Sequence, residues 1–361
     1  MELFLPKVRG PFASRIFGLR PRDGADPIYT PLFIPSISAT VDADWRRLAA
    51  GLGRGAAARG IVLVSAFDLA EDRNSVGPKA ARAGSRKPRG ARAAASHRSP
   101  TRLAGFRGVV LDSGGYEARK LRARWPRARF EEVASRFRAD IVVGFDPAEV
   151  ADDPERQVRD QIRFLAGRRK GTLRTLLLHM DPADLDVEAF VRRVLLPHAR
   201  SFDILGLTEK DLGPSFPGRV RGILALRRAM DAASLVCPLH LFGTDDPLSL
   251  VVYAAAGVDI FDGLGWSTEF VDARTMSRHD LGHGPLCARW RAFALENGLA
   301  DPERDAVLDL TFEWNVREIT SLMAEVRRGV LHDEEEVLLA LCRRAGELPA
   351  DDLFEEMRHG R

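Results

Sequence analysis

Eight short apolar segments recur along the sequence, and their spacing is the feature that most limits the fold. Each is rich in β-branched or large apolar residues and closes with Gly, Asp, Ser or Pro, as buried parallel strands do. The segments are TPLFIPSI (30–37), GIVLVSAF (60–67), GVVLDSGG (108–115), DIVVGFD (140–146), LRTLLLHM (173–180), FDILGL (202–207), CPLHLFG (237–243) and VDIFDG (258–263). Eight strands separated by crossovers predict a closed (β/α)8 barrel.

Helical patterns fill the intervals between these segments. Residues 154–167, for example, follow two aspartates and begin with Pro154, which is a typical helix start. An open, doubly wound sheet is the competing α/β fold, but the Gly-rich turn that usually follows its first strand is missing. We therefore predict one domain over 1–361, an α/β TIM barrel at about 30–265 with additional C-terminal helices at about 285–361.

The composition and the N-terminal residues indicate where in the cell the protein is expected. The N-terminal residues do not have the layout of a signal peptide, and no apolar segment is long enough to span a bilayer. The three cysteines are odd in number and widely spaced, which argues against a disulfide framework. We therefore expect a cytoplasmic protein that does not bind a membrane.

The net charge of +3 says little, but basic residues cluster in one segment. Between Asp72 and Asp112 there is no acidic residue. The basic residues there are Arg73, Lys79, Arg82, Arg86, Lys87, Arg89, Arg92, Arg98, Arg102 and Arg107. This segment either supplies contacts to the phosphates of a nucleic acid or is an exposed loop of an arginine-rich protein.

Polar residues gather at the C-terminal ends of the predicted strands, where TIM-barrel enzymes carry their catalytic groups. These ends carry Asp112, Asp146, His179 and Asp262. A single strand-end aspartate is often only a helix N-cap, but three carboxylates and a histidine at one mouth favour an active site. Paired carboxylates suit displacement at an anomeric carbon, where one attacks C1′ and the other transfers protons. A glycosidase would use the same pair, although aromatic residues for sugar stacking are few, at 7%.

Two of these strand ends resemble signatures of the tRNA-guanine transglycosylases. DSGGYE (112–117) resembles the family's DSGG-[FY]-Q motif, and GVDIFDG (257–263) resembles its nucleophile strand. Further likeness follows in the same order along the chain. It is found in TPLFIPSISATVDA (30–43), ADIVVGFD (139–146), ILGLTE (204–209), LHLFGTDDPLSLVVYAAAGVD (239–259) and FEWNVREITSLMAEVRRGV (312–330).

The resemblance implies a role for each matching residue. Asp262 would be the nucleophile, Asp112 the general acid and base, and Asp146 the acceptor of hydrogen bonds from a guanine-like base. The base would stack between Tyr116 and Phe242. His179 would either donate to the base or line the mouth. The implied substrate-binding residues are Ser113, Gly114, Tyr116, Asp146, His179, Gly206, Leu207, Phe242 and Gly243.

The sequence departs from the family pattern in three places. The family's zinc-binding cysteines are missing, and the position of its zinc-binding histidine lies within Glu313-Trp314-Asn315, so we predict no metal. The segment GLGWSTEF (263–270) replaces a basic P-T-R motif after the nucleophile. The interval between Asp112 and Asp146 is also short. These differences favour a divergent member, with the DpdA-like enzymes that modify DNA as one such branch.

The expected function is therefore base exchange on a nucleic acid. We predict a pentosyltransferase that replaces guanine by a 7-deazaguanine-type base in tRNA or DNA through a covalent intermediate on Asp262, without a cofactor. Two alternatives stay open: a glycosyl hydrolase or transferase acting on a small nucleoside or deazapurine, and a non-catalytic accessory subunit. A homodimer and a complex with a partner protein are both compatible with the sequence.

Overall fold

The computed structural model describes most of the chain. The described residues are 1–4, 10, 12–22, 24–41, 49, 52, 60–74, 103, 105–147, 153–168, 171–299, 304–345 and 351–358. The basic residues from Lys79 to Arg102 lie outside these ranges, so the prediction that they contact phosphates stays a prediction.

Eight parallel strands close into a barrel in the order β10-β11-β4-β5-β6-β7-β8-β9. Each strand falls within one of the eight apolar segments, so the predicted α/β TIM barrel is confirmed. The strands are β4 (Leu32–Ile37), β5 (Ile61–Ser65), β6 (Gly108–Asp112), β7 (Ile141–Val143), β8 (Leu173–Leu178), β9 (Ile204–Thr208), β10 (Leu239–Phe242) and β11 (Ile260–Gly263).

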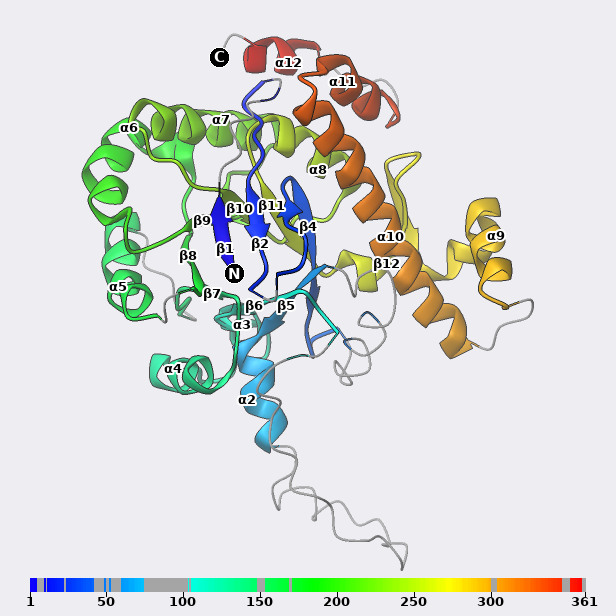
Figure 1. Cartoon of the computed structure of the whole chain (residues 1–361), viewed down its shortest axis with the longest axis horizontal. Helices are drawn as coiled ribbons and strands as arrows, with labels where there is room; N and C mark the ends of the chain where they lie inside the picture. Colours follow the sequence, from blue (N-terminus) through cyan, green and yellow to red (C-terminus); the bar gives the residue numbers. More distant parts are fainter. Residues whose placement is uncertain are drawn as a thin grey trace, which may run out of the picture.

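Helices surround the barrel in the described part of the chain (Figure 1). They are α2 (Ala66–Asn74), α3 (Gly115–Lys120), α4 (Arg127–Arg136), α5 (Pro154–Ala166), α6 (Val187–Phe190), α7 (Phe216–Ala232) and α8 (Pro247–Ala255). Short 3-10 and π turns extend α6 to His198. The start of α5 shows how the sequence sets these boundaries: Asp153 accepts a hydrogen bond from the amide of Glu155 at 2.9 Å, with Pro154 in the first turn.

Alternation along the strands decides which side chains enter the barrel. One face of each strand packs on the helices, while the other fills the interior with residues such as Ile34, Val110 and Ile260. The residues two positions further along β4, β6 and β11 are Ser36, Asp112 and Asp262. The strand period therefore directs these three polar side chains to the same interior, one layer closer to the C-terminal mouth.

The opposite end of the barrel is covered by an antiparallel sheet that the sequence patterns did not predict. It consists of β1 (Glu2–Phe4), β2 (Gly18–Arg20) and β3 (Ile28–Tyr29), and Figure 1 shows β1 and β2 in front of the barrel strands. Met1 and Leu19 are buried against the interior apolar residues. A Cβ on Gly108, at the start of β6, would lie 2.5 Å from the Met1 side chain, which shows how closely this end is packed.

The C-terminal region adds a hairpin and four helices. The hairpin pairs β12 (Glu269–Asp272) with β13 (Ser277–Asp280). The helices are α9 (Ala288–Glu296), α10 (Arg304–Leu331), α11 (Glu335–Arg343) and α12 (Asp351–Arg358). The long α10 runs along the barrel wall (Figure 1) and is one of the C-terminal helices predicted at about 285–361. None of the described helices has the length and apolarity needed to cross a bilayer.

Candidate active site

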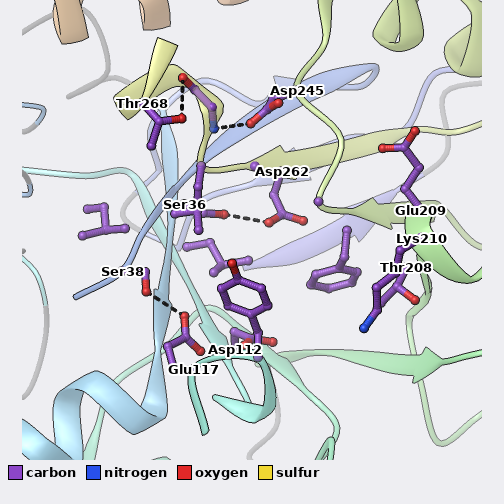
Figure 2. Close-up of a pocket in the computed structure, with 18 of the residues that line it drawn as sticks. Ser36, Ser38, Asp112, Glu117, Thr208, Glu209, Lys210, Asp245, Asp262 and Thr268 are labelled. Atoms are coloured by element: carbon purple, nitrogen blue, oxygen red, sulfur yellow. Dashed lines mark hydrogen bonds between the residues drawn. The ribbon is translucent and has the colours of Figure 1, made fainter. Parts of the chain in front are cut away.

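A cavity of about 750 Å³ opens at the C-terminal ends of the barrel strands. Six of the predicted site residues line it. They are Asp112, Tyr116, Asp146, Phe242, Gly243 and Asp262. The structure thus brings the two predicted catalytic carboxylates together around one cavity, and Figure 2 shows Asp262 beside Ser36 and Asp112 beside Glu117.

Asp262 is held by two side chains from neighbouring strands. Its Oδ2 accepts a hydrogen bond from the Ser36 hydroxyl at 2.6 Å, and its Oδ1 lies 3.1 Å from Nε2 of His240. The His240 ring stacks on Phe242 with the ring centroids 3.9 Å apart, which restricts its orientation. The Asp262 residue is 6% exposed, so the carboxylate meets the cavity in a fixed position.

Asp112 is surrounded by other carboxyl groups. Burial, followed by the negative charges of Glu117, Asp146 and Asp262, raises the pKa of Asp112 to about 7. Burial and the nearby Asp68 also raise the pKa of Glu117, whose oxygens accept hydrogen bonds from Ser38 and Ser65, each at 2.9 Å. A carboxyl group that titrates near neutral pH can both donate and accept a proton, as acid and base catalysis requires.

Ser113, Gly114 and Gly115 of the DSGG turn position the site without lining the cavity. Gly114 has φ of +86°, and a Cβ there would lie 2.6 Å from the side chain of Phe67. A Cβ on Gly115 would lie 2.5 Å from both the carbonyl and the carboxylate of Asp146. Ser113 is buried, and its carbonyl accepts a hydrogen bond from the Trp125 indole at 2.8 Å. The glycines therefore allow α3 to approach the loop that carries Asp146.

Asp146 is engaged by side chains of the protein itself. Arg119 donates to both carboxylate oxygens, from Nη1 to Oδ1 at 3.1 Å and from Nη2 to Oδ2 at 2.9 Å. His179 lies on the other side, with Nε2 3.0 Å from Oδ1. Although burial opposes it, hydrogen bonds from His179 and Arg119 lower the pKa of Asp146. The carboxylate is therefore ionised and already paired.

His179 lies behind Asp146 and does not line the main cavity. It faces an adjoining cavity of about 450 Å³, and its Nδ1 lies 2.7 Å from Oδ2 of Asp211. Burial disfavours the charged ring, but the hydrogen bonds with Asp146 and Asp211 raise the pKa of His179 to about 9. The ring is therefore a cation between two carboxylates at neutral pH, and both of its nitrogens are occupied.

The remaining predicted residues have supporting positions. Gly206 and Leu207 lie within β9 and do not line the cavity. A Cβ on Gly206 would lie 2.8 Å from Phe242, so this glycine makes room for the aromatic ring. Tyr116 lines the cavity with 45% of its surface exposed.

Sequence reasoning missed several residues of the cavity. Ser36 and His240 hold Asp262, and alternation along β4 and β10 was the signal that would have found them. Arg119 had no such signal, because its importance depends on a distant partner. Other missed lining residues include Ser38, Thr208, Glu209, Lys210, Arg219, Asp245, Glu269 and Arg278.

The segment after β11 is fixed by α10 and by a hydrogen bond to β4. The Trp266 indole is buried and donates to the Ser36 carbonyl at 2.9 Å. Asn315 accepts from the Val271 amide at 2.8 Å and donates to the carbonyls of Trp266 and Glu269. Among the described residues, no group of three or more His, Cys, Asp or Glu side chains has the geometry of a metal site.

A parallel eight-stranded barrel with carboxylates around a cavity at its mouth has the architecture of a TIM-barrel enzyme. No protein-family model matches the chain. The chain is 23% identical over 253 residues to the tRNA-guanine(15) transglycosylase of Thermococcus onnurineus. The match covers 64% of this chain and 42% of that relative, so the chain spans less than half of the relative's length. Fold and similarity together fit a transglycosylase-like superfamily.

Proposed function

We propose that the protein is a pentosyltransferase that exchanges a base on a nucleic acid. Asp262 is the nucleophile and Asp112 the acid and base of this proposal. The observation that carries it is the convergence of these two carboxyl groups on one cavity, with Asp262 oriented by Ser36 and His240. Similarity to a tRNA-guanine(15) transglycosylase supports the same reaction class.

The first step forms a covalent glycosyl-enzyme. A carboxylate oxygen of Asp262 attacks C1′ of the target nucleotide, and the bond between C1′ and the base nitrogen breaks. The bond electrons leave with guanine, which takes a proton from Asp112. Because the pKa of Asp112 is raised to about 7, a proton is available on this group near neutral pH.

The second step releases the enzyme. The incoming base gives its ring N–H proton to the Asp112 carboxylate, and the freed nitrogen attacks C1′. The ester bond between C1′ and Asp262 breaks, and the carboxylate is restored. Protons and charges therefore balance over the cycle without a cofactor.

The proposal extends to the identity of the polymer and of the incoming base. We propose a 7-deazaguanine-type base, inserted into tRNA or into DNA. The target nucleotide must leave its stack to reach a cavity at the barrel mouth, and Tyr116 and Phe242 line that cavity as stacking surfaces.

A second candidate is a glycosyl hydrolase or transferase for a small nucleoside. It is favoured by the pairing of the arginines that line the cavity. Arg119, Arg219 and Arg278 each form an ion pair with a carboxylate, at 2.8–2.9 Å, which weakens their attraction for phosphate.

The test is incorporation of radiolabelled guanine into bulk tRNA and, separately, into duplex DNA. We expect one polymer to be labelled by the wild type and Asp262→Asn to lose roughly three orders of magnitude or more of this activity. Asp184→Asn, an exposed aspartate beyond β8, is the matched control and should keep full activity. Labelling that persists in Asp262→Asn would exclude the covalent role. Failure to label either polymer, with release of free base from nucleosides, would favour the second candidate.

A further inference from the structure

The guanidinium of Arg119 carries two N–H donors on the edge that faces away from its ion pair with Asp146. A guanidinium carries five N–H donors in a fixed plane. Nη1 donates to Asp146 and to the Pro147 carbonyl at 3.0 Å, and Nη2 donates once to Asp146. Within the described part of the chain, the second Nη2 hydrogen and the Nε hydrogen have no acceptor. These two hydrogens lie on the same side of the guanidinium and form a fork.

Arg119 belongs to the wall of the main cavity. Arg119 lines the cavity together with Asp112 and Asp262, and 25% of its side chain is exposed. Its rotation is restricted, because Asp146 fixes one edge through two hydrogen bonds and is itself only 5% exposed. A guanidinium fixed in this way is a preorganised donor pair for a planar ligand.

The same contacts weaken Asp146 as an acceptor for a ligand. Oδ1 accepts from Arg119 and faces His179, while Oδ2 accepts from Arg119. A base whose edge presents two donors would have to displace the guanidinium from a buried ion pair, and breaking such a pair leaves a buried charge uncompensated.

We propose that Arg119, and not Asp146, reads the base in this cavity, and that the base presents a pair of hydrogen-bond acceptors. This inference rests on the proposed function, because it assumes that a purine-type base occupies the site. Guanine meets the requirement with O6 and N7, the acceptor pair that arginine forks bind most often. A 7-deazapurine lacks N7, so it would need a substituent at position 7 that carries an acceptor oxygen.

Two probe bases separate this recognition from recognition by Asp146. Hypoxanthine lacks the exocyclic amine of guanine but keeps O6 and N7. Unsubstituted 7-deazaguanine keeps N1–H and the amine but lacks N7. If Arg119 reads the base, hypoxanthine binds within a few-fold of guanine and 7-deazaguanine binds about tenfold or more weakly, the effect of one charge-assisted hydrogen bond. Recognition by Asp146 gives the reverse order.

The experiment is calorimetric titration of the full chain with guanine, hypoxanthine and 7-deazaguanine. Arg119→Gln removes the fork and releases Asp146, so we expect its preference to shift toward 7-deazaguanine. Arg119→Lys keeps the positive charge beside Asp146 without a planar fork, so we expect it to lose the preference for hypoxanthine over 7-deazaguanine. Arg124→Gln, an exposed arginine just beyond α3, is the matched control and should bind as the wild type does.

The outcomes separate this inference from the proposed function. Stronger binding of 7-deazaguanine than of hypoxanthine by the wild type would overturn recognition by Arg119 and leave base exchange standing. An unchanged preference in both Arg119 variants would overturn it equally. If the folded wild type binds none of the three bases, the proposed function and the inference that rests on it both fail.

Discussion

Three carboxyl groups, Asp68, Asp112 and Glu117, lie close enough to repel one another, with Asp68 and Glu117 buried and Asp112 partly exposed. The pKa of Asp68 is raised to about 6 by burial, against hydrogen bonds from Ala39 and Ser38, and that of Asp112 is raised to about 7. The pKa of Glu117 is raised as well, mainly by burial. Groups of this kind favour the unfolded state once they ionise, because water solvates their charges better than the protein does.

Glu117→Gln should therefore stabilise the protein, and more so at pH 8 than at pH 5. Between the ordinary carboxyl pKa near 4 and the raised values, the folded state binds more protons than the unfolded state, so wild-type stability falls as pH rises through this window. The amide removes one charge from the cluster. We expect a gain on the order of 1 kcal/mol at pH 8 in the free energy of unfolding by urea, and a smaller gain at pH 5.

Comparing Glu117→Gln with the wild type cancels the contributions of other groups to the pH dependence of stability. His179, with its pKa raised to about 9, also loses stabilisation as pH rises, but it does so in both proteins. Glu131→Gln, in the exposed pair with Arg127, is a suitable control and should change little. A loss of stability in Glu117→Gln at pH 8 would show that its hydrogen bonds with Ser38 and Ser65 outweigh the repulsion.

Residues differ in how far the sequence could predict their positions. Asp112 and Asp262 were predictable because each ends an apolar strand, and strand ends meet at one mouth. The pairing of Asp146 with Arg119 was not, since neither periodicity nor a motif links two side chains on different loops. The contacts of Glu117 were not predictable either, because they involve Ser38, just after β4, and Ser65 of β5, which approach it only in the folded chain.

Among the elements, α10 has the most direct effect on the segment that follows β11. Asn315 joins this helix to Trp266, Glu269 and Val271 through three hydrogen bonds, of which those to Trp266 and Val271 are buried. Trp314 adds a fourth, from its indole to the Val271 carbonyl at 3.0 Å. Trp314 and Asn315 occupy the region where the resemblance implied a metal-binding histidine, and here they hold the segment by hydrogen bonding and packing.

Substituting Asn315 should loosen this segment. We expect Asn315→Ala to lower the free energy of unfolding by about 2–4 kcal/mol, because buried backbone groups lose their partners. Asn315→Asp keeps the shape but faces two carbonyls with an oxygen, so it should destabilise at least as much. Denaturant unfolding measures both. The control is Asn297→Ala, which removes one hydrogen bond at the exposed end of α9. If Asn315→Ala loses no more unfolding free energy than Asn297→Ala, the conclusion that Asn315 holds this segment is contradicted.

Element boundaries were predicted well where burial is continuous and poorly where it is not. All eight barrel strands were found, because each is apolar on both faces, as parallel strands covered by helices must be. The short strands β1, β2 and β3 were missed, since two or three residues carry no measurable periodicity. The hairpin of β12 and β13 was missed because β13, with the sequence SRHD, is polar and largely exposed and so has no apolar pattern.

At the scale of the whole molecule, the two ends of the barrel differ in the kind of residue that fills them. The C-terminal end carries the cavity and its charged residues, whereas the N-terminal end is filled by Met1 and Leu19. This division is general for TIM barrels, in which one face carries the site and the other contributes stability. A change at the covered end should therefore alter stability and leave ligand binding intact.

Leu19→Ala tests this division. Leu19 is fully buried among interior residues of the barrel, so truncation should lower the free energy of unfolding by about 2–5 kcal/mol through lost burial and a residual cavity. Leu295→Ala is the matched control, because Leu295 is 63% exposed on α9 and its truncation should change stability by less than about 0.5 kcal/mol. Base affinity, measured by calorimetry well below the unfolding temperature, should be the same in wild type and in Leu19→Ala. A tenfold weaker affinity in a folded Leu19→Ala protein would mean that packing at the covered end sets the geometry of the carboxylates at the mouth.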